Sequence, residues 1–443
     1  MLELLFIVIL LNFIYAARNY YMFINPASSF TFGLLCAVLV SIIYKQDWYL
    51  NNFLPSTFVI VSLGVTTFNI VSSLVWRNKF CCQNNLKNVA ANFRSNHLSI
   101  NNHVTFSILV FLIVVCYWEY KYKLQAVGTS SIFTAMSEFD QEYKYGDKIE
   151  VPILLRNLIL LRTCICYYFF YMLSKIIAMK DSCGNRLNII LICVVGLIGG
   201  FLSGSRGNVI NFILFSLFAW SIFKTLLNPK FRFFSLKKTL TVTIGVFISV
   251  ALFLKSTEWV GRDLEGWKLS DYFAVYCGAE IKNLDSFVRE ENKRNSKWEF
   301  FTLRNLLGGV SEKDNSNNRE RIQFRDVKGR NLGNVYTTFQ NYYSDMRYFG
   351  VVFYVGLMAF IILLLYIRSL DKRVIKKRFD FILFLYAYFS TTVAYSFFHE
   401  RFYAAMSWYT VKLIIELYLF NLLMNRFEKN KSRQLCLKQK NLQ

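Results

Sequence analysis

The chain has 443 residues, 55% of them hydrophobic and 18% aromatic, and a net charge of +23. Apolar stretches of about 15 to 25 residues recur along its length, which indicates a polytopic helical membrane protein and excludes a soluble globular enzyme. A charge of +23 would favour nucleic acid as the partner of a soluble chain. Here the basic residues gather between the apolar stretches, so we expect no nucleic-acid binding.

Eleven transmembrane helices are expected, within a range of ten to twelve, so the predicted fold class is all-α. In chain order they cover residues 2–17, 28–44, 54–76, 103–120, 152–178, 187–203, 208–223, 238–256, 349–367, 379–397 and 408–424.

The loops between these helices alternate in charge. Basic residues concentrate near residues 77–94, 180–186, 224–238 and 368–378 and in the tail from residue 426. The positive-inside rule places these segments in the cytoplasm. The C-terminus is then cytoplasmic, and with eleven helices the N-terminus lies outside.

One external segment is too long to be a simple connector, and it defines the domain organisation. We expect an N-terminal bundle of about eight helices over residues 1–256 and a large external loop over 257–348. Closing transmembrane helices over 349–424 and a basic tail over 425–443 follow. Inside the loop, helical spacing of apolar residues predicts a helix from Ser270 to Asn292 with Ser270 as its N-cap, and a second short helix from Trp298 to Leu307.

Ten cysteines do not form a disulfide framework in this sequence. No CxxC pair and no Cys/His cluster with ligand spacing occurs, and Cys277 is the only cysteine expected outside. We therefore expect no structural disulfide, no metal and no cofactor.

Arg206 lies in a short turn, Leu202–Asn208, between two uncharged stretches. A guanidinium at the membrane surface is costly unless it has an anionic partner, so Arg206 is a candidate for a functional site. The small residues around it allow backbone to approach a ligand or another helix closely. The alternative is a helix-packing turn with a snorkelling arginine.

A second arginine, Arg162, lies well inside the fifth expected helix, so it should face the bundle interior and need a partner. Lys412 and Glu416 stand one turn apart in the last helix and can pair with each other. We favour that pairing, with a contact between Glu416 and Arg162 as the alternative.

The expected outward face is rich in arginine, whose fork suits bidentate phosphate binding. Pairing with nearby acidic residues is the alternative for each single loop arginine. Besides Arg206, the outward arginines are Arg262, Arg289, Arg304, Arg319, Arg321, Arg325, Arg330, Arg347 and Arg401.

The sequence His399-Glu400-Arg401 directly follows the tenth expected helix. A histidine, a carboxylate and an arginine together could supply a base, an orienting group and a phosphate clamp. The alternative is an interfacial helix end within a belt of aromatic side chains.

Three segments together resemble the oligosaccharide repeat-unit polymerases, the Wzy type of O-antigen polymerase. They are the turn LSGSRGNVI at residues 202–210, the segment from Tyr272 to Asp285, and the segment from Gly333 to Gly350. Their order also fits: a turn, a large external loop, then closing helices. The sequence departs from the family at Met346-Arg347, where a Phe-Gly pair is common.

The resemblance implies a metal-independent glycosyltransferase of the GT-C type in a bacterial inner membrane, with its active site facing the periplasm. The substrates would be oligosaccharide repeat units on undecaprenyl diphosphate. A chain-length regulator, a flippase and membrane lipid are the partners expected with it. An O-antigen ligase-like transferase and a flippase or transporter for the lipid-linked unit are the alternatives.

The resemblance also suggests roles for individual residues. Arg206, with Arg325 or Arg330, would bind the diphosphate and stabilise the leaving group. His399, or else Asp345 or Glu400, would accept the proton of the attacking hydroxyl. Further candidates for diphosphate binding are Arg162, Arg347 and Arg401, and candidates for the sugar site are Tyr336, Tyr342 and Tyr343.

Overall fold

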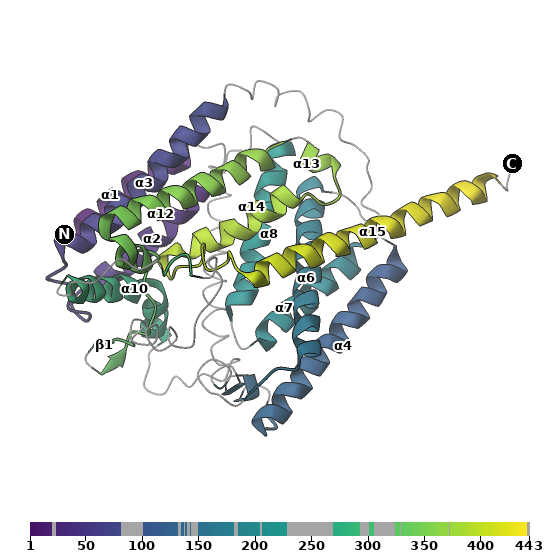
Figure 1. Ribbon diagram of the computed structural model, residues 1–443, viewed down its shortest axis with the longest axis horizontal. Helices are drawn as coiled ribbons and strands as arrows, with labels where there is room; N and C mark the ends of the chain where they lie inside the picture. Colours follow the sequence, from purple (N-terminus) through teal and green to yellow (C-terminus); the bar gives the residue numbers. More distant parts are fainter. Residues whose placement is uncertain are drawn as a thin grey trace.

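In its described residues, the computed structural model is a bundle of helices with a small β-hairpin (Figure 1). It describes residues 1–19, 24–80, 101–131, 134–136, 138–139, 142, 149–180, 185–203, 206–227, 269–292, 301–304, 324–327, 329–371 and 373–440. The helices are α1 (Leu2–Asn19), α2 (Pro26–Ile43), α3 (Pro55–Phe80), α4 (Asn102–Val127), α6 (Ile153–Met179), α7 (Arg186–Leu202), α8 (Arg206–Leu227), α10 (Leu269–Glu291), α12 (Phe339–Ser369), α13 (Arg373–Lys376), α14 (Phe381–Ala394), the 3-10 helix η2 (Tyr395–Phe397) and α15 (Trp408–Lys440). Strands β1 (Asp326–Val327) and β2 (Arg330–Asn331) pair antiparallel.

Seven of these helices are long and apolar enough to cross a membrane: α1, α2, α3, α4, α6, α8 and α12. Shorter apolar helices cover Arg186–Leu202 and Phe381–Phe397. The predicted all-α membrane protein is therefore confirmed at this level. The last expected helix coincides with the start of α15, and the expected helix at 238–256 lies outside the described residues.

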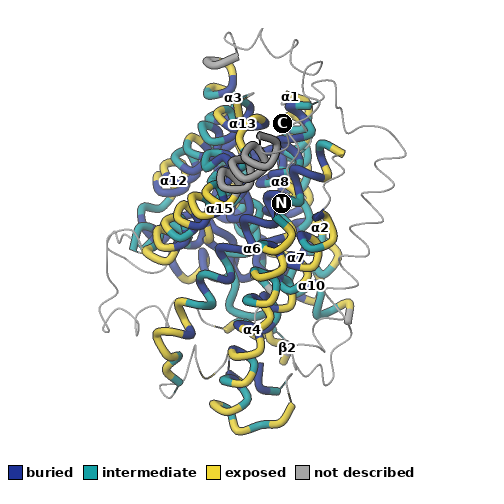
Figure 2. The backbone as a smooth tube through the Cα atoms, turned by 90° about the vertical axis from the view of Figure 1, so that its right-hand side faces the viewer, coloured by how far each residue is buried: buried dark blue, intermediate teal, exposed yellow. Residues whose placement is uncertain are grey.

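The outer helices contain many exposed residues, and the centre of the bundle is buried (Figure 2). Many of the exposed side chains on these helices are apolar. On α1, for example, Leu4, Ile7 and Leu11 are exposed, while Leu5 and Ile9 are buried. Such a helix is apolar all round, as a membrane helix must be, because lipid replaces water on its outer face. The core packs α12 on α3, α6 on α8 and α4 on α7.

The loops sort into two ends of the bundle. At one end, Asp285 of α10 accepts from the Leu54 N–H at 2.9 Å, so α10 lies beside the start of α3. At the opposite end, Lys175 near the end of α6 donates to Lys377 O at 2.5 Å, and Lys224 near the end of α8 donates to Ala178 O at 3.0 Å. The basic loops around Lys180 and residues 371–380 therefore share one end, as the charge pattern predicts.

The expected helix in the large loop is α10. It begins at Leu269, so the prediction of Ser270 as N-cap is wrong: Ser270 lies in the first turn. Its residue Gly278 packs so tightly on α2 that an added Cβ would lie 2.7 Å from Val40 Cγ1. Ser41 of α2 donates to Gly278 O at 2.8 Å. Of the expected helix at 298–307, only residues 301–304 are described, as a turn.

Candidate functional site

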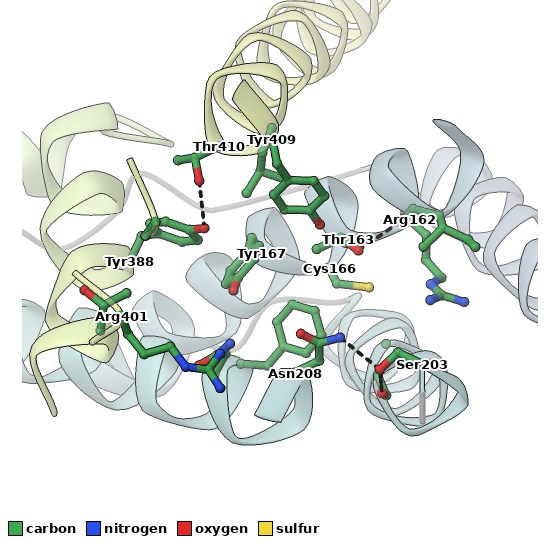
Figure 3. Close-up of a pocket in the computed structure, with 18 of the residues that line it drawn as sticks. Arg162, Thr163, Cys166, Tyr167, Ser203, Asn208, Tyr388, Arg401, Tyr409 and Thr410 are labelled. Atoms are coloured by element: carbon green, nitrogen blue, oxygen red, sulfur yellow. Dashed lines mark hydrogen bonds between the residues drawn. The ribbon is translucent and has the colours of Figure 1, made fainter. Parts of the chain in front are cut away.

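A cavity of about 290 Å³ lies where α6, α7, α8, α14, α15 and the segment after η2 meet (Figure 3). Two arginines, Arg162 and Arg401, line it, and none of its described lining residues is Asp or Glu. Most other polar lining groups are hydroxyls and amides, among them Thr163, Tyr167, Ser203, Asn208, Asn211, Tyr388, Thr392, Tyr395 and Thr410. The cavity is thus positively charged and rich in hydrogen-bonding groups.

Arg162 is only 4% exposed and forms an ion pair with a carboxylate of α4. Its Nη1 donates to Glu119 of α4, and its Nη2 donates to Gly199 O at 3.0 Å. The predicted contact with Glu416 is therefore wrong. Lys412 and Glu416 do not form an ion pair either, within the described part of the chain.

Three glycines of α7 allow this close packing. An added Cβ would lie 2.7 Å from Cys166 Sγ at Gly196, 2.9 Å from the Arg162 guanidinium at Gly199 and 3.0 Å from Val209 Cγ2 at Gly200. Small residues let membrane helices approach each other closely. In α7 they let α6 and α8 close around the cavity, and they make room for a buried guanidinium.

The turn after α7 borders the same cavity. Ser203 donates to Gly200 O at 2.6 Å, and the Asn208 amide donates to the Ser203 hydroxyl at 2.9 Å. Helix α8 begins at Arg206, so the positive end of its dipole lies next to the cavity. The Arg206 side chain lies outside the described atoms, and its expected role stays a prediction.

Arg401 supplies the second cation. Its guanidinium carbon lies 5.6 Å from the centre of the Tyr395 ring, and it extends toward Asn208 (Figure 3). Within the described residues no carboxylate lies at ion-pair distance from Arg401. An exposed cation of this kind is free to bind an anion that enters the cavity.

His399 and Glu400 precede Arg401 but do not line the cavity. Glu400 is buried and accepts the Tyr403 N–H at 2.7 Å and the Ala404 N–H at 3.2 Å, so it caps the turn that follows. Burial raises the pKa of Glu400 to about 7. Burial, together with the charge of Arg401, lowers the pKa of His399 to about 4, so this imidazole is neutral at pH 7.

Arg325, another predicted diphosphate ligand of the loop, is not among the described lining residues of this cavity. Arg325 binds Glu290 with both guanidinium nitrogens and donates from Nε to the Tyr336 hydroxyl at 3.0 Å. The pairing raises the pKa of Arg325 further above its usual value. Arg330 forms part of β2, and its side chain lies outside the described atoms.

The predicted sugar-site tyrosines are packed in the protein interior. Tyr336, Tyr342 and Tyr343 are each no more than 2% exposed. Tyr342 contacts the ring of Tyr403 at a centroid distance of 5.9 Å, and Tyr343 donates to Asn292 Oδ1 at 2.7 Å. These tyrosines build the junction between α10 and α12, and their expected contact with sugar stays a prediction.

Asp345 and Arg347 lie at the same junction. The Asp345 carboxylate accepts the Phe301 N–H at 2.9 Å and the Thr302 N–H at 3.0 Å. Arg347 lies 3.4 Å from the Glu291 carboxylate and has a φ of 55° and a ψ of −140°, which interrupts α12. This is the position where the resembled family commonly has glycine, the residue that adopts such angles freely.

Comparisons with known proteins identify no relative. No protein-family model matches the chain. No curated protein and no solved structure matches it either. The family resemblance therefore remains an expectation drawn from the motifs.

Sequence reasoning missed two groups of site residues. Glu119 falls at the polar end of the fourth expected helix, and charge alone does not distinguish it from Glu416 as the partner of Arg162. Tyr167 and Tyr388 face the cavity from α6 and α14. No local pattern distinguishes them from the many other aromatic residues of the membrane helices.

Proposed function

We propose that the protein polymerises undecaprenyl-diphosphate-linked oligosaccharide repeat units at the periplasmic face of a bacterial inner membrane. The growing glycan is transferred from its lipid carrier to a sugar hydroxyl of a newly delivered unit. Neighbouring proteins, a flippase and a chain-length regulator, would supply the units and set the polymer length.

The observation that carries this proposal is the pair of arginines in one cavity without an acidic residue among its described lining. Arg162 is already paired with Glu119, but Arg401 has no described carboxylate at ion-pair distance. The cavity therefore keeps a positive charge that favours an anionic ligand, because an uncompensated charge is costly within a membrane protein. Arginine binds phosphate oxygens with a planar fork. A diphosphate that leaves with the bonding electrons gains negative charge, and a preorganised cation stabilises that charge most in the transition state.

The remaining lining suits a carbohydrate. Tyr167, Tyr388 and Tyr395 provide ring faces and hydroxyls, and Asn208 and Asn211 provide amides. Sugars present apolar faces and many hydroxyls, so aromatic rings and uncharged polar groups match them. These residues are better placed for the sugar beside the diphosphate than the buried tyrosines at the start of α12.

The reaction itself needs a base and a leaving group. A hydroxyl oxygen of the incoming unit bonds to the anomeric carbon of the growing chain, and the bond from that carbon to the diphosphate oxygen breaks. The diphosphate keeps the electron pair, and the hydroxyl proton passes to a base. His399 lies two residues from Arg401 and is the expected base, with Glu400 and Asp345 as the alternatives; none of the three is among the described lining residues of the cavity.

A deletion strain of the host tests this proposal through the size of its surface polysaccharide on a gel. Loss of a polymerase leaves a single repeat unit on the acceptor. Loss of a ligase leaves the acceptor bare while lipid-linked polymer accumulates, and loss of a flippase leaves unflipped lipid-linked units. Complementation with Arg206→Ala should fail to restore long chains although the protein is inserted, and Arg206→Lys should restore them in part.

A further inference from the structure

Glu119 of α4 contacts two cations at once, and both cations bind the C-terminal end of α7. Its Oε2 accepts from Arg162 Nη1, and its Oε1 lies 3.1 Å from Lys123 Nζ. Arg162 donates to Gly199 O at 3.0 Å, and Lys123 donates to Leu202 O. The three charged side chains are no more than 7% exposed.

These contacts fix the end of a helix whose last carbonyls need external donors. The final carbonyl groups of a helix have no partner within it and carry partial negative charge, so two cations there are favourable. The two cations would repel each other if Glu119 did not lie between them. The carboxylate therefore holds both donors in place.

The end of α7 in turn sets the position of the cavity wall. Arg162 and Ser203 both line the cavity, and Ser203 directly follows the carbonyl that Lys123 binds. Three residues separate Leu202 from Arg206, where α8 begins. A shift of the α7 end would therefore move Arg162 and the start of α8 together.

We propose that Glu119 is a positioning residue for an anion site in this cavity. It is not among the described lining residues, so it acts through Arg162 and through the turn between α7 and α8. The ligand class is a phosphate or diphosphate group. The inference rests on the proposed function, which places a diphosphate in this cavity.

The test is the affinity of the purified full chain, in lipid nanodiscs, for inorganic diphosphate, measured by calorimetry. Glu119→Gln should weaken binding about tenfold, the scale at which outer partners of ligand-holding groups act. Glu119→Asp keeps the charge but draws Arg162 back, so binding should be intermediate. The matched control is Glu3→Gln, which removes an exposed ion pair to Lys45 of 2.6 Å and should leave affinity unchanged.

Glu119→Asp also keeps the test decisive if Glu119→Gln does not fold, because it leaves no buried cation unpaired. An affinity loss in Glu119→Asp with an unchanged thermal midpoint supports positioning and cannot come from general destabilisation. Wild-type affinity in both variants would overturn the inference while leaving the anion site in place. If the wild-type protein itself does not bind diphosphate at millimolar concentrations, the proposed function is contradicted as well.

Discussion

Gly199 of α7 lies so close to Arg162 of α6 that an added Cβ would be 2.9 Å from the guanidinium carbon. Gly199→Ala should therefore displace the buried arginine from Glu119 and from the cavity. Overpacking of this kind costs about 1–3 kcal/mol. We expect a lower thermal midpoint and loss of polymer, measured in detergent and in a complemented deletion strain.

The matched control is Gly356→Ala in α12, where the nearest atoms to an added Cβ lie 3.8 Å away. Alanine should be tolerated there, because it fits and favours the helix. If Gly199→Ala keeps the thermal midpoint and the polymer as Gly356→Ala does, the close contact between Gly199 and Arg162 does not contribute to stability or activity.

Arg401 has no carboxylate at ion-pair distance within the described residues, so its removal should affect ligand binding more than folding. Arg401→Ala should reach the membrane at wild-type levels and produce short or no polymer. Arg401→Lys should keep part of the activity, because it retains the charge without the planar fork. The measurement is polysaccharide chain length on a gel with membrane protein levels by immunoblot.

Arg373→Ala serves as the control for that experiment. Arg373 is exposed and pairs with Asp371 at 2.7 Å, at the basic end of the bundle. Equal loss of polymer in both variants would show that surface charge in general, and not the cavity cation, is responsible.

Some parts of this structure can be predicted from the sequence, and others cannot. The charge pattern correctly predicts that the described basic loops near Lys180 and residues 371–380 lie at one end of the bundle, because each loop carries its own basic residues. The helix in the large loop is also predicted within one residue, since six apolar positions recur at its spacing, although Ser270 misleads about its first residue.

The partner of Arg162 could not be predicted, for a physical reason. A buried arginine needs an anionic partner, and which carboxylate reaches it depends on how α4, α6 and α7 pack. In the sequence alone, Glu119 and Glu416 are equally good candidates for that partner. Likewise, the presence of tyrosines in the sequence does not show whether they bind sugar or pack between helices. Tyr342 belongs to such a junction, and Tyr167 lines the cavity.

Glu280 of α10 should make stability depend on pH. It is fully buried, neither carboxylate oxygen has a partner in the described structure, and burial raises its pKa well above the usual value. The folded protein therefore favours the protonated acid. This contribution to stability is complete below about pH 4.5, the unfolded pKa, and is lost as the pH rises toward the raised folded pKa.

Glu280→Gln should remove that pH dependence, since the amide has the same shape and no charge. The measurement is the thermal midpoint of both proteins between pH 4 and pH 8, with Glu150→Gln at an exposed position as the control. If the thermal midpoint changes with pH by the same amount in the wild type, Glu280→Gln and Glu150→Gln, the assignment is contradicted.

Arg347 has backbone angles that glycine adopts more easily than other residues. Two substitutions should therefore separate the effect of backbone strain on stability from the effect of the ion pair with Glu291. Arg347→Gly and Arg347→Ala both lose the contact with Glu291, but only alanine keeps the strain. We expect Arg347→Gly to be more stable than Arg347→Ala by about 1 kcal/mol or more in denaturant titrations. Equal stability would mean that the interruption of α12 relaxes once arginine is removed.

Polymerisation by the purified protein tests the central claim most directly. The full chain, reconstituted in nanodiscs, receives the lipid-linked single repeat unit of its host, with no metal added and no other protein. We predict a ladder of lipid-linked oligomers that grows with time and is absent with Arg206→Ala. Single units that remain unchanged in the presence of correctly folded wild-type protein would contradict the account.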